Sequence, residues 1–144
     1  MSYVRVWIHA VWGTKRREPI LEKGVRQKLF SHIVANAASK RLFVDTVNGY
    51  LEHVHCLFAL NADISIGKAL QLIKGEASHW FNIQDIAKSK LEWADEYYAV
   101  SVSESDINRV RHYIRTQEEH HRTKSFADEC QKFLDEYGFT KSHG

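Results

Sequence analysis

Apolar and polar residues alternate at the start of the chain and then change to a longer period. Every second position from Val4 to Trp12 is apolar, which predicts a strand with one well-buried face. A basic loop that contains the single proline, Pro19, follows. From Leu21 to about Lys40 the apolar residues recur every three or four positions, which predicts an amphipathic helix.

Similar patterns predict three more strands and three more helices. The strands are predicted at 41–50, 53–60 and 97–102, and the helices at 64–82, 103–122 and 126–138. Asn48-Gly49 lies between the first two of these strands and is a strong turn signal, so these two strands should form a hairpin. Ser125 and Gly138 are suited to begin and to end the last helix.

The predicted helix at 103–122 changes character along its length. Ser103 and Asp106 have the spacing of a capping box at its start. An apolar stripe runs from Ile107 to Ile114, but the residues beyond Ile114 are polar all round. This second half should therefore bridge solvent or pack against something other than the protein's own core.

The order of the predicted elements is β-α-β-β-α-β-α-α. The first six match the ferredoxin-like split β-α-β pattern, so the expected fold is α+β, with an antiparallel sheet and helices mainly on one face. Two C-terminal helices extend this unit, and the last of them is short. We expect a single domain, 1–144, because 44% of the 144 residues are hydrophobic, 26% are charged, and no segment has the composition of a linker.

Composition also bounds the possible functions. No apolar run is long enough to span a membrane or to resemble a signal peptide, so we expect a cytoplasmic protein without membrane contact. The two cysteines, Cys56 and Cys130, should be reduced thiols, and no Cys/His set has the spacing of a zinc finger. The net charge of +2 allows nucleic-acid binding only through a local basic patch.

His53 and His55 are the first candidate site. One residue separates them, so on a strand both side chains point to the same face. Two imidazoles in this arrangement could hold one cation, although the pair does not select the metal. The alternative is two histidines near a strand end that hydrogen-bond to neighbours or meet solvent, which is the commoner case for such a pair alone.

Tyr113 and Gln117 are the second candidate site, since four residues separate neighbours on one face of a helix. Tyrosine can act as a covalent nucleophile, and a metal can assist it by polarising a phosphoryl oxygen. The amide oxygen of Gln117 could complete the ligands of such a metal. A half-buried tyrosine beside a solvated glutamine is the commoner alternative.

Basic residues interspersed with aromatic ones suggest contact with single-stranded nucleic acid. The candidate DNA-binding residues are Lys15, Arg16, Arg17, Lys74 and Arg109. By itself this signal is weak, because charged runs are usually solvated faces and aromatic residues usually pack in cores.

Five segments in order resemble the single-tyrosine HUH transposases of small bacterial insertion sequences, the IS200-like transposases. "EHVHCLFAL" resembles the family's histidine–hydrophobic–histidine strand, and "VRHYIRTQEEHH" resembles its catalytic helix. "LIKGEASHWFN" resembles its Lys-Gly-x-Ser-Ser segment, with Ala77 in place of the first serine. "VRVWIHAVWGTKRREPIL" resembles its first strand and basic turn, and "YYAVSVSES" the strand before the catalytic helix. The resemblance covers roughly Tyr3 to Lys124.

This resemblance implies a transposase that cleaves and rejoins single-stranded DNA with hairpin ends. Tyr113 would form a 5′-phosphotyrosine, while His53, His55 and Gln117 would hold Mg²⁺ or Mn²⁺. The resemblance further implies a homodimer with exchanged catalytic helices, located in the bacterial cytoplasm and on the nucleoid when bound to DNA. The polar second half of 103–122 would fit such an exchange.

Two alternatives remain open at this point. The chain could be a domesticated HUH nuclease that processes repeated hairpins by the same chemistry. It could also be a catalytically silent module that binds single-stranded DNA, although the presence of all four candidate site residues argues against lost catalysis.

Overall fold

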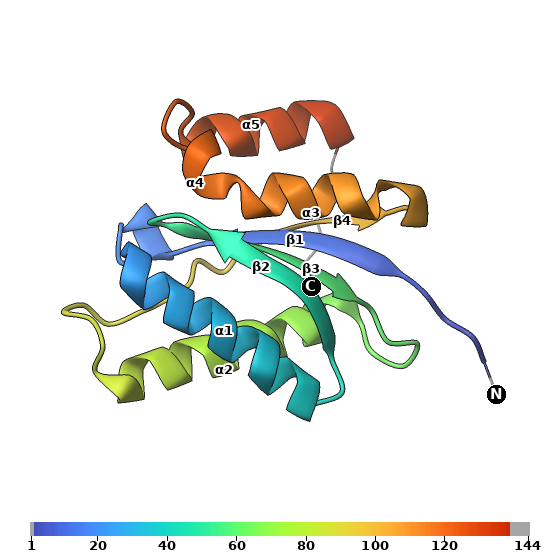
Figure 1. The fold of residues 1–144 in the computed structure, drawn as a ribbon, viewed down its shortest axis with the longest axis horizontal. Coiled ribbons are helices and arrows are strands. Elements are labelled where there is room, and N and C mark those ends of the chain that lie inside the picture. The colour runs from blue at the N-terminus through green and yellow to red at the C-terminus, as the bar shows by residue number, and fades with distance from the viewer. Residues whose placement is uncertain (1, 139–144) are drawn as a thin grey trace.

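A computed structural model of the chain describes residues 2–138 and contains a four-stranded sheet covered on both faces by helices (Figure 1). The strands are β1 (Trp7–Gly13), β2 (Phe43–Gly49), β3 (His53–Ala59) and β4 (Tyr98–Val102). The longer helices are α1 (Lys23–Ser39), α2 (Ile66–Gln84), α3 (Ile107–Arg115), α4 (Gln117–His120) and α5 (Phe126–Tyr137). Two single-turn 3-10 helices are η1 (Lys15–Arg17) and η2 (Glu104–Asp106).

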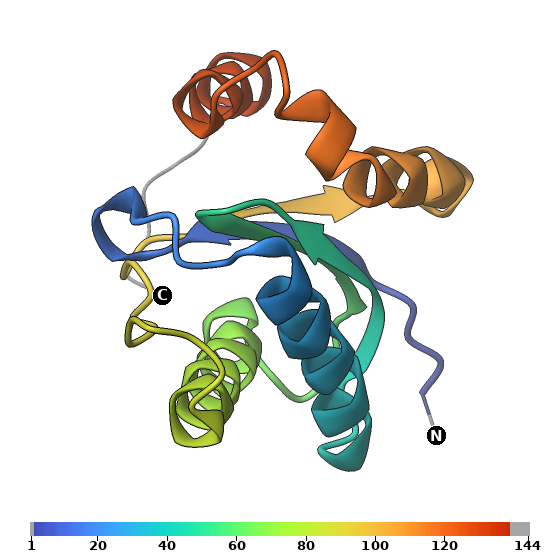
Figure 2. The same cartoon turned by 60° about the vertical axis from the view of Figure 1, so that its left-hand side comes forward.

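The strand order is β2-β3-β1-β4, and each strand is antiparallel to its neighbours. Helices α1 and α2 cover one face, while α3, α4 and α5 cover the other (Figure 2). The predicted α+β class and antiparallel sheet are therefore confirmed, and the C-terminal helices form a second layer of their own. Within residues 2–138 no helix combines the length and apolar character needed to cross a membrane.

The two faces of β1 explain one departure from the predicted pattern. All seven residues of β1 are buried, although alternation predicted only one well-buried face. Ile8, Ala10 and Trp12 pack in the core beneath α1 and α2. Trp7 packs with residues of α3, and Val11 packs with residues of α5. The second face is buried because the C-terminal helices lie on it, which alternation alone does not reveal.

The β2–β3 hairpin is present, but its turn lies later than predicted. Asn48 and Gly49 are paired with β3 inside the ladder, and the chain turns through residues 50–52. A Cβ on Gly49 would come within 2.1 Å of the His53 carbonyl oxygen, so glycine is required there by close backbone approach. Asn48 Nδ2 donates to the carbonyls of Ile114 and Arg115 at 3.0 and 3.1 Å.

The prediction of a single helix at 103–122 is wrong, because this segment forms η2, α3 and α4 with a break at Thr116. The backbone of Thr116 leaves helical geometry at φ −99° and ψ 20°. The Asn48 side-chain amide donates hydrogen bonds to two carbonyls at the end of α3, so these carbonyls do not need backbone amides from a further helical turn. Ser103 makes no capping bond to the backbone. By contrast, Ser125 accepts from the Asp128 amide at 3.1 Å, and this cap was predicted.

Candidate active site

Strand β3 sends two histidines to the face of the sheet that the C-terminal helices cover. Val54, Cys56 and Phe58 alternate into the core beneath α1 and α2, so the side chains of His53 and His55 point the other way. Both imidazoles are fully buried, and their ring centroids lie 5.1 Å apart. The pair is therefore surrounded by groups that α3, α4 and α5 contribute.

Helices α3 and α4 bring Tyr113 and Gln117 to these histidines. Gln117 Oε1 lies 3.0 Å from His53 Nε2, and Gln117 Nε2 donates to the Tyr113 carbonyl at 3.3 Å. The rings of Tyr113 and His55 meet edge-on with centroids 5.6 Å apart. The four residues expected to carry the chemistry thus converge within one chain.

Helix α5 adds Glu129, which the sequence analysis did not select. Its Oε1 lies 3.0 Å from His55 Nε2 and 3.4 Å from His53 Nε2, and its Oε2 accepts a hydrogen bond from the Tyr113 hydroxyl. The side chain is 1% exposed. Burial alone would raise the pKa of Glu129, but the adjacent imidazoles of His121 and His55 outweigh burial, and this pKa lies well below its usual range. Glu129 is therefore a buried, ionised carboxylate at the centre of the site.

A further group orients each imidazole of the β3 pair. His53 Nδ1 donates to Glu52 Oε1 at 2.7 Å, and His55 Nδ1 lies 2.9 Å from His9 Nε2 on β1. Burial lowers the pKa of His9 to about 3 and that of His55 to about 4, so both rings are neutral at pH 7. Partners of this kind select the tautomer and direct the remaining ring nitrogen.

The donor atoms of the site suit a divalent cation. His53 Nδ1 is bound to Glu52, and His53 Nε2 faces the amide oxygen of Gln117 at 3.0 Å. An imidazole nitrogen and an amide oxygen can both ligate one cation. The ligand atoms of His53, His55 and Glu129 all lie within 4.8 Å of one another. Imidazole with carboxylate and amide oxygen is a set that Mn²⁺ and other divalent ions accept.

Comparison with known families decides the identity. A sequence model described as "Transposase IS200 like" matches residues 2–117, which include the β3 histidines, Tyr113 and Gln117. The chain belongs to the IS200-like transposase family. The match ends at Gln117, so α5 and Glu129 lie beyond the part of the chain that the family model covers.

Two solved structures share the fold of this IS200-like transposase. A protein from Deinococcus radiodurans R1 that is named as a transposase superposes with a TM-score of 0.64 at 21% identity, covering 81% of this chain and 95% of that one. A REP-associated tyrosine transposase bound to a REP hairpin gives a TM-score of 0.59 at 17% identity, covering 84% of this chain and 72% of that one. No protein of curated function matches the sequence.

The five basic residues expected to bind DNA do not form one patch in this transposase. Lys15 and Arg16 pair with exposed glutamates, whereas the Arg17 guanidinium lies over the ring of Phe126, 5.2 Å from its centroid. Phe126 in turn stacks on His53, so Arg17 is close to the site.

The other two basic residues lie apart from the β3 histidines. Lys74 belongs to α2 on the opposite face of the sheet, where it donates to the Ala94 carbonyl at 3.0 Å. There it lines a groove of about 450 Å³ together with Trp93. Arg109 is exposed on α3 and pairs with Asp106 at 3.4 Å.

The residues that the sequence analysis missed carried a partial signal. Glu129 lies in the buried stripe of α5 with Phe126, Cys130 and Phe133. A carboxylate in an apolar stripe needs a compensating partner, and this anomaly could have singled it out. His9 lies on the second face of β1. The alternating pattern predicted that this face is less buried than the first, so it gave no reason to select His9.

Proposed function

We propose that this IS200-like transposase cleaves and rejoins single-stranded DNA by attack of Tyr113 on a phosphodiester bond. The observation that carries the proposal is the convergence of the Tyr113 hydroxyl and both β3 imidazoles on Glu129. His53, His55 and Gln117 would hold Mg²⁺ or Mn²⁺. When bound, a divalent cation stabilises negative charge on the transferring phosphoryl group.

The Tyr113 hydroxyl requires activation in this environment. Burial and the neighbouring carboxylate of Glu129 both raise the pKa of Tyr113, so the phenol is protonated at pH 7. A protonated phenol is a weak nucleophile, and a carboxylate in contact with it can take up its proton during attack. Glu129 is the described residue that already accepts a hydrogen bond from this hydroxyl.

The proposed reaction balances without water or a nucleoside triphosphate. The Tyr113 oxygen forms a bond to phosphorus, the bond from phosphorus to the 3′-oxygen breaks, and the phenolic proton is transferred to the leaving 3′-oxygen. The products are a 5′-phosphotyrosine and a free 3′-hydroxyl. Attack by another 3′-hydroxyl on the phosphotyrosine reverses the exchange and joins two strands.

All four proposed site residues approach one another within a single chain. A homodimer with exchanged helices remains a prediction, and light scattering of the purified protein would test whether a dimer forms. We propose hairpin-bearing single-stranded DNA as the substrate, because the REP-associated relative was solved with a REP hairpin. In this proposal Arg17, next to Phe126 and His53, is the nearest of the five basic candidates to the reacting phosphate.

The experiment incubates the protein with single-stranded oligonucleotides that carry hairpins, in the presence of Mn²⁺ or Mg²⁺. Wild type should form an SDS-resistant adduct with the oligonucleotide, and Tyr113→Phe should form none while retaining DNA binding. His53→Ala and His55→Ala should each abolish metal-dependent cleavage. An adduct formed by Tyr113→Phe would remove the role of Tyr113, and binding without any adduct in wild type would favour the silent binding module.

A further inference from the structure

We propose that Glu129 is a ligand of the divalent cation, so that α5 completes a site made by His53, His55, Gln117 and a carboxylate. The inference rests on the proposed function, because the cation is the one assigned there. It goes beyond that function because α5 follows the region matched by the family model. Figure 1 shows α5 lying over α3 on the side away from α1 and α2.

The position of Glu129 is built into the packing of α5. Phe126, Cys130 and Phe133 are buried on the same helix and pack with Val11 of β1. Ser125 accepts a hydrogen bond at the first turn of α5, which further defines where the helix begins. A helix anchored in this way holds the carboxylate among the imidazoles. Such burial of a charge is costly unless a counter-charge compensates it.

Three imidazole nitrogens converge on Glu129 Oε1. The Nε2 atoms of His55, His121 and His53 lie 3.0, 3.3 and 3.4 Å from this oxygen. His121 Nδ1 donates to the Lys124 carbonyl at 2.7 Å, which directs the buried Nε2 of this ring towards the carboxylate. The carboxylate is thus surrounded by nitrogen atoms of a type that can ligate a cation.

A divalent cation could lie among these nitrogen and oxygen atoms, because all of them can serve as ligands. Two imidazole nitrogens, the Gln117 amide oxygen and the Glu129 carboxylate would form a set with one negative charge. A carboxylate adds Coulombic attraction for the cation and supplies the oxygen donor that Mg²⁺ and Mn²⁺ prefer. Because the carboxylate belongs to α5, binding of the cation should also stabilise the docked position of this helix.

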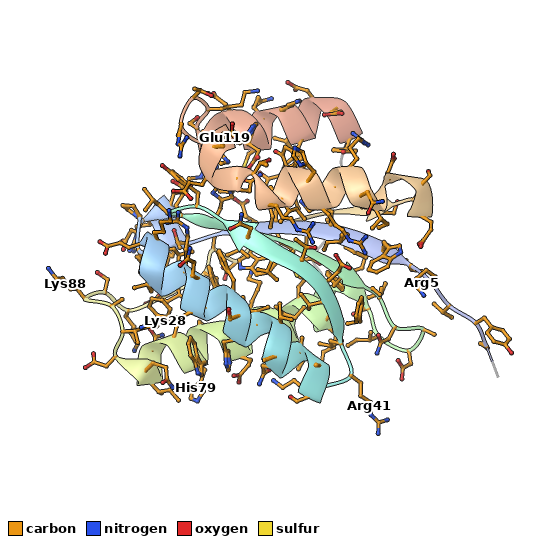
Figure 3. The ribbon with its side chains drawn as sticks, in the orientation of Figure 1. Arg5, Lys28, Arg41, His79, Lys88 and Glu119 are labelled. Carbon is orange, nitrogen blue, oxygen red and sulfur yellow. The ribbon has the colours of Figure 1, made fainter. Side chains whose placement is uncertain are left out.

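The test measures Mn²⁺ binding to the full chain without DNA, at fixed pH, by isothermal titration calorimetry and by the electron paramagnetic resonance signal of free Mn²⁺. Glu129→Gln keeps the shape of the side chain and removes its charge. The matched control is Glu119→Gln, because Glu119 lies on α4 with an exposed side chain that is labelled in Figure 3. Circular dichroism and thermal unfolding in EDTA verify that each variant folds.

We expect Glu129→Gln to weaken Mn²⁺ binding on the order of tenfold or more, and Glu119→Gln to leave it unchanged. At the same concentration, Mn²⁺ should raise the Tm of wild type and of Glu119→Gln more than that of Glu129→Gln. If Glu129→Gln does not fold, Glu129→Asp provides the comparison. This variant keeps the carboxylate on a shorter side chain, farther from the imidazoles, and we expect an Mn²⁺ affinity between those of wild type and a variant without the carboxylate.

The possible failures are distinguishable. If Glu129→Gln binds Mn²⁺ as tightly as wild type while His53→Ala does not, the inference is overturned and the metal site of the proposed function remains. If wild type itself binds no Mn²⁺, the inference is also overturned. The Tyr113-dependent adduct assay then judges the proposed function separately.

Discussion

Replacement of Gly49 by alanine tests the geometry that positions His53. A Cβ at this position would lie 2.1 Å from the His53 carbonyl oxygen and 3.1 Å from both the His53 carbonyl carbon and the Val54 Cα. All three atoms are backbone, so no side chain can rotate away to relieve the contact. The same oxygen accepts the Tyr50 amide at 3.1 Å, which closes the β2–β3 turn.

The expected cost follows from these contacts. Overpacking that forces backbone movement costs up to about 3 kcal/mol, and loss of the turn hydrogen bond adds about 1 kcal/mol. For a chain of this size, a loss of that order lowers the Tm by about 10 °C. The backbone of His53 must shift by roughly 1 Å, and a displacement of this size at a reacting group can lower the rate on the order of 100-fold.

Two assays on the same variant test the reasoning. Thermal and urea unfolding give the loss of stability, and the Mn²⁺-dependent adduct assay gives the loss of activity. Gly24→Ala is the matched control, because a Cβ there meets no atom within 4 Å and Gly24 lies in the first turn of α1. This control should be stabilised by about 0.5 kcal/mol and should retain full activity.

The reasoning is refuted if Gly49→Ala unfolds at the wild-type temperature and forms adduct at the wild-type rate. If Gly49→Ala loses stability but keeps its activity, the close backbone approach is supported, but the position of His53 does not depend on it.

Three further predictions concern other parts of the fold. Asn48→Ala should destabilise the protein by about 1–2 kcal/mol in urea unfolding, because two carbonyls at the end of α3 lose their donor; an unchanged unfolding midpoint would mean that water replaces the amide. The hydrogen bond from Arg111 lowers the pKa of Asp45 in the folded protein. The pair therefore stabilises the fold fully above the unfolded-state pKa of about 3.9, and this stabilisation is lost as the pH falls through the lower pKa of the folded state. The stability difference between wild type and Asp45→Asn should therefore be constant from about pH 7 to 5 and shrink below about pH 4; a difference that grows on acidification would contradict the pairing. Burial raises the pKa of the Cys56 thiol, so thiol reagents should modify it only after unfolding, and rapid modification of the native protein would contradict its burial.

Local pattern predicted the bounds of two elements well. Strand β3 was predicted at 53–60 and spans His53–Ala59, and helix α2 was predicted at 64–82 and spans Ile66–Gln84. Helix α2 follows its periodicity because one stripe packs into the core, whereas β3 is a nearly continuous apolar run because both of its faces are buried. The errors occurred where tertiary contacts intervene, as at Thr116, where Asn48 from another strand satisfies the end of α3.

The candidate site was predictable to the extent that its geometry is local. Residues separated by two on a strand share a face, and residues separated by four on a helix share a face, so sequence alone grouped His53 with His55 and Tyr113 with Gln117. The sequence also carries the five segments that resemble the IS200-like family, which the family match confirms. It does not indicate how far one pair lies from the other.

Only the tertiary structure decided which other groups surround the two pairs. Glu129 reaches the β3 histidines because α5 packs on the second face of the sheet, and His9 reaches His55 because β1 lies beside β3. These contacts join segments that are 74 and 46 residues apart. The periodicity of one segment reflects only which of its own faces is buried. The partner that buries this face is determined by the packing of the whole chain.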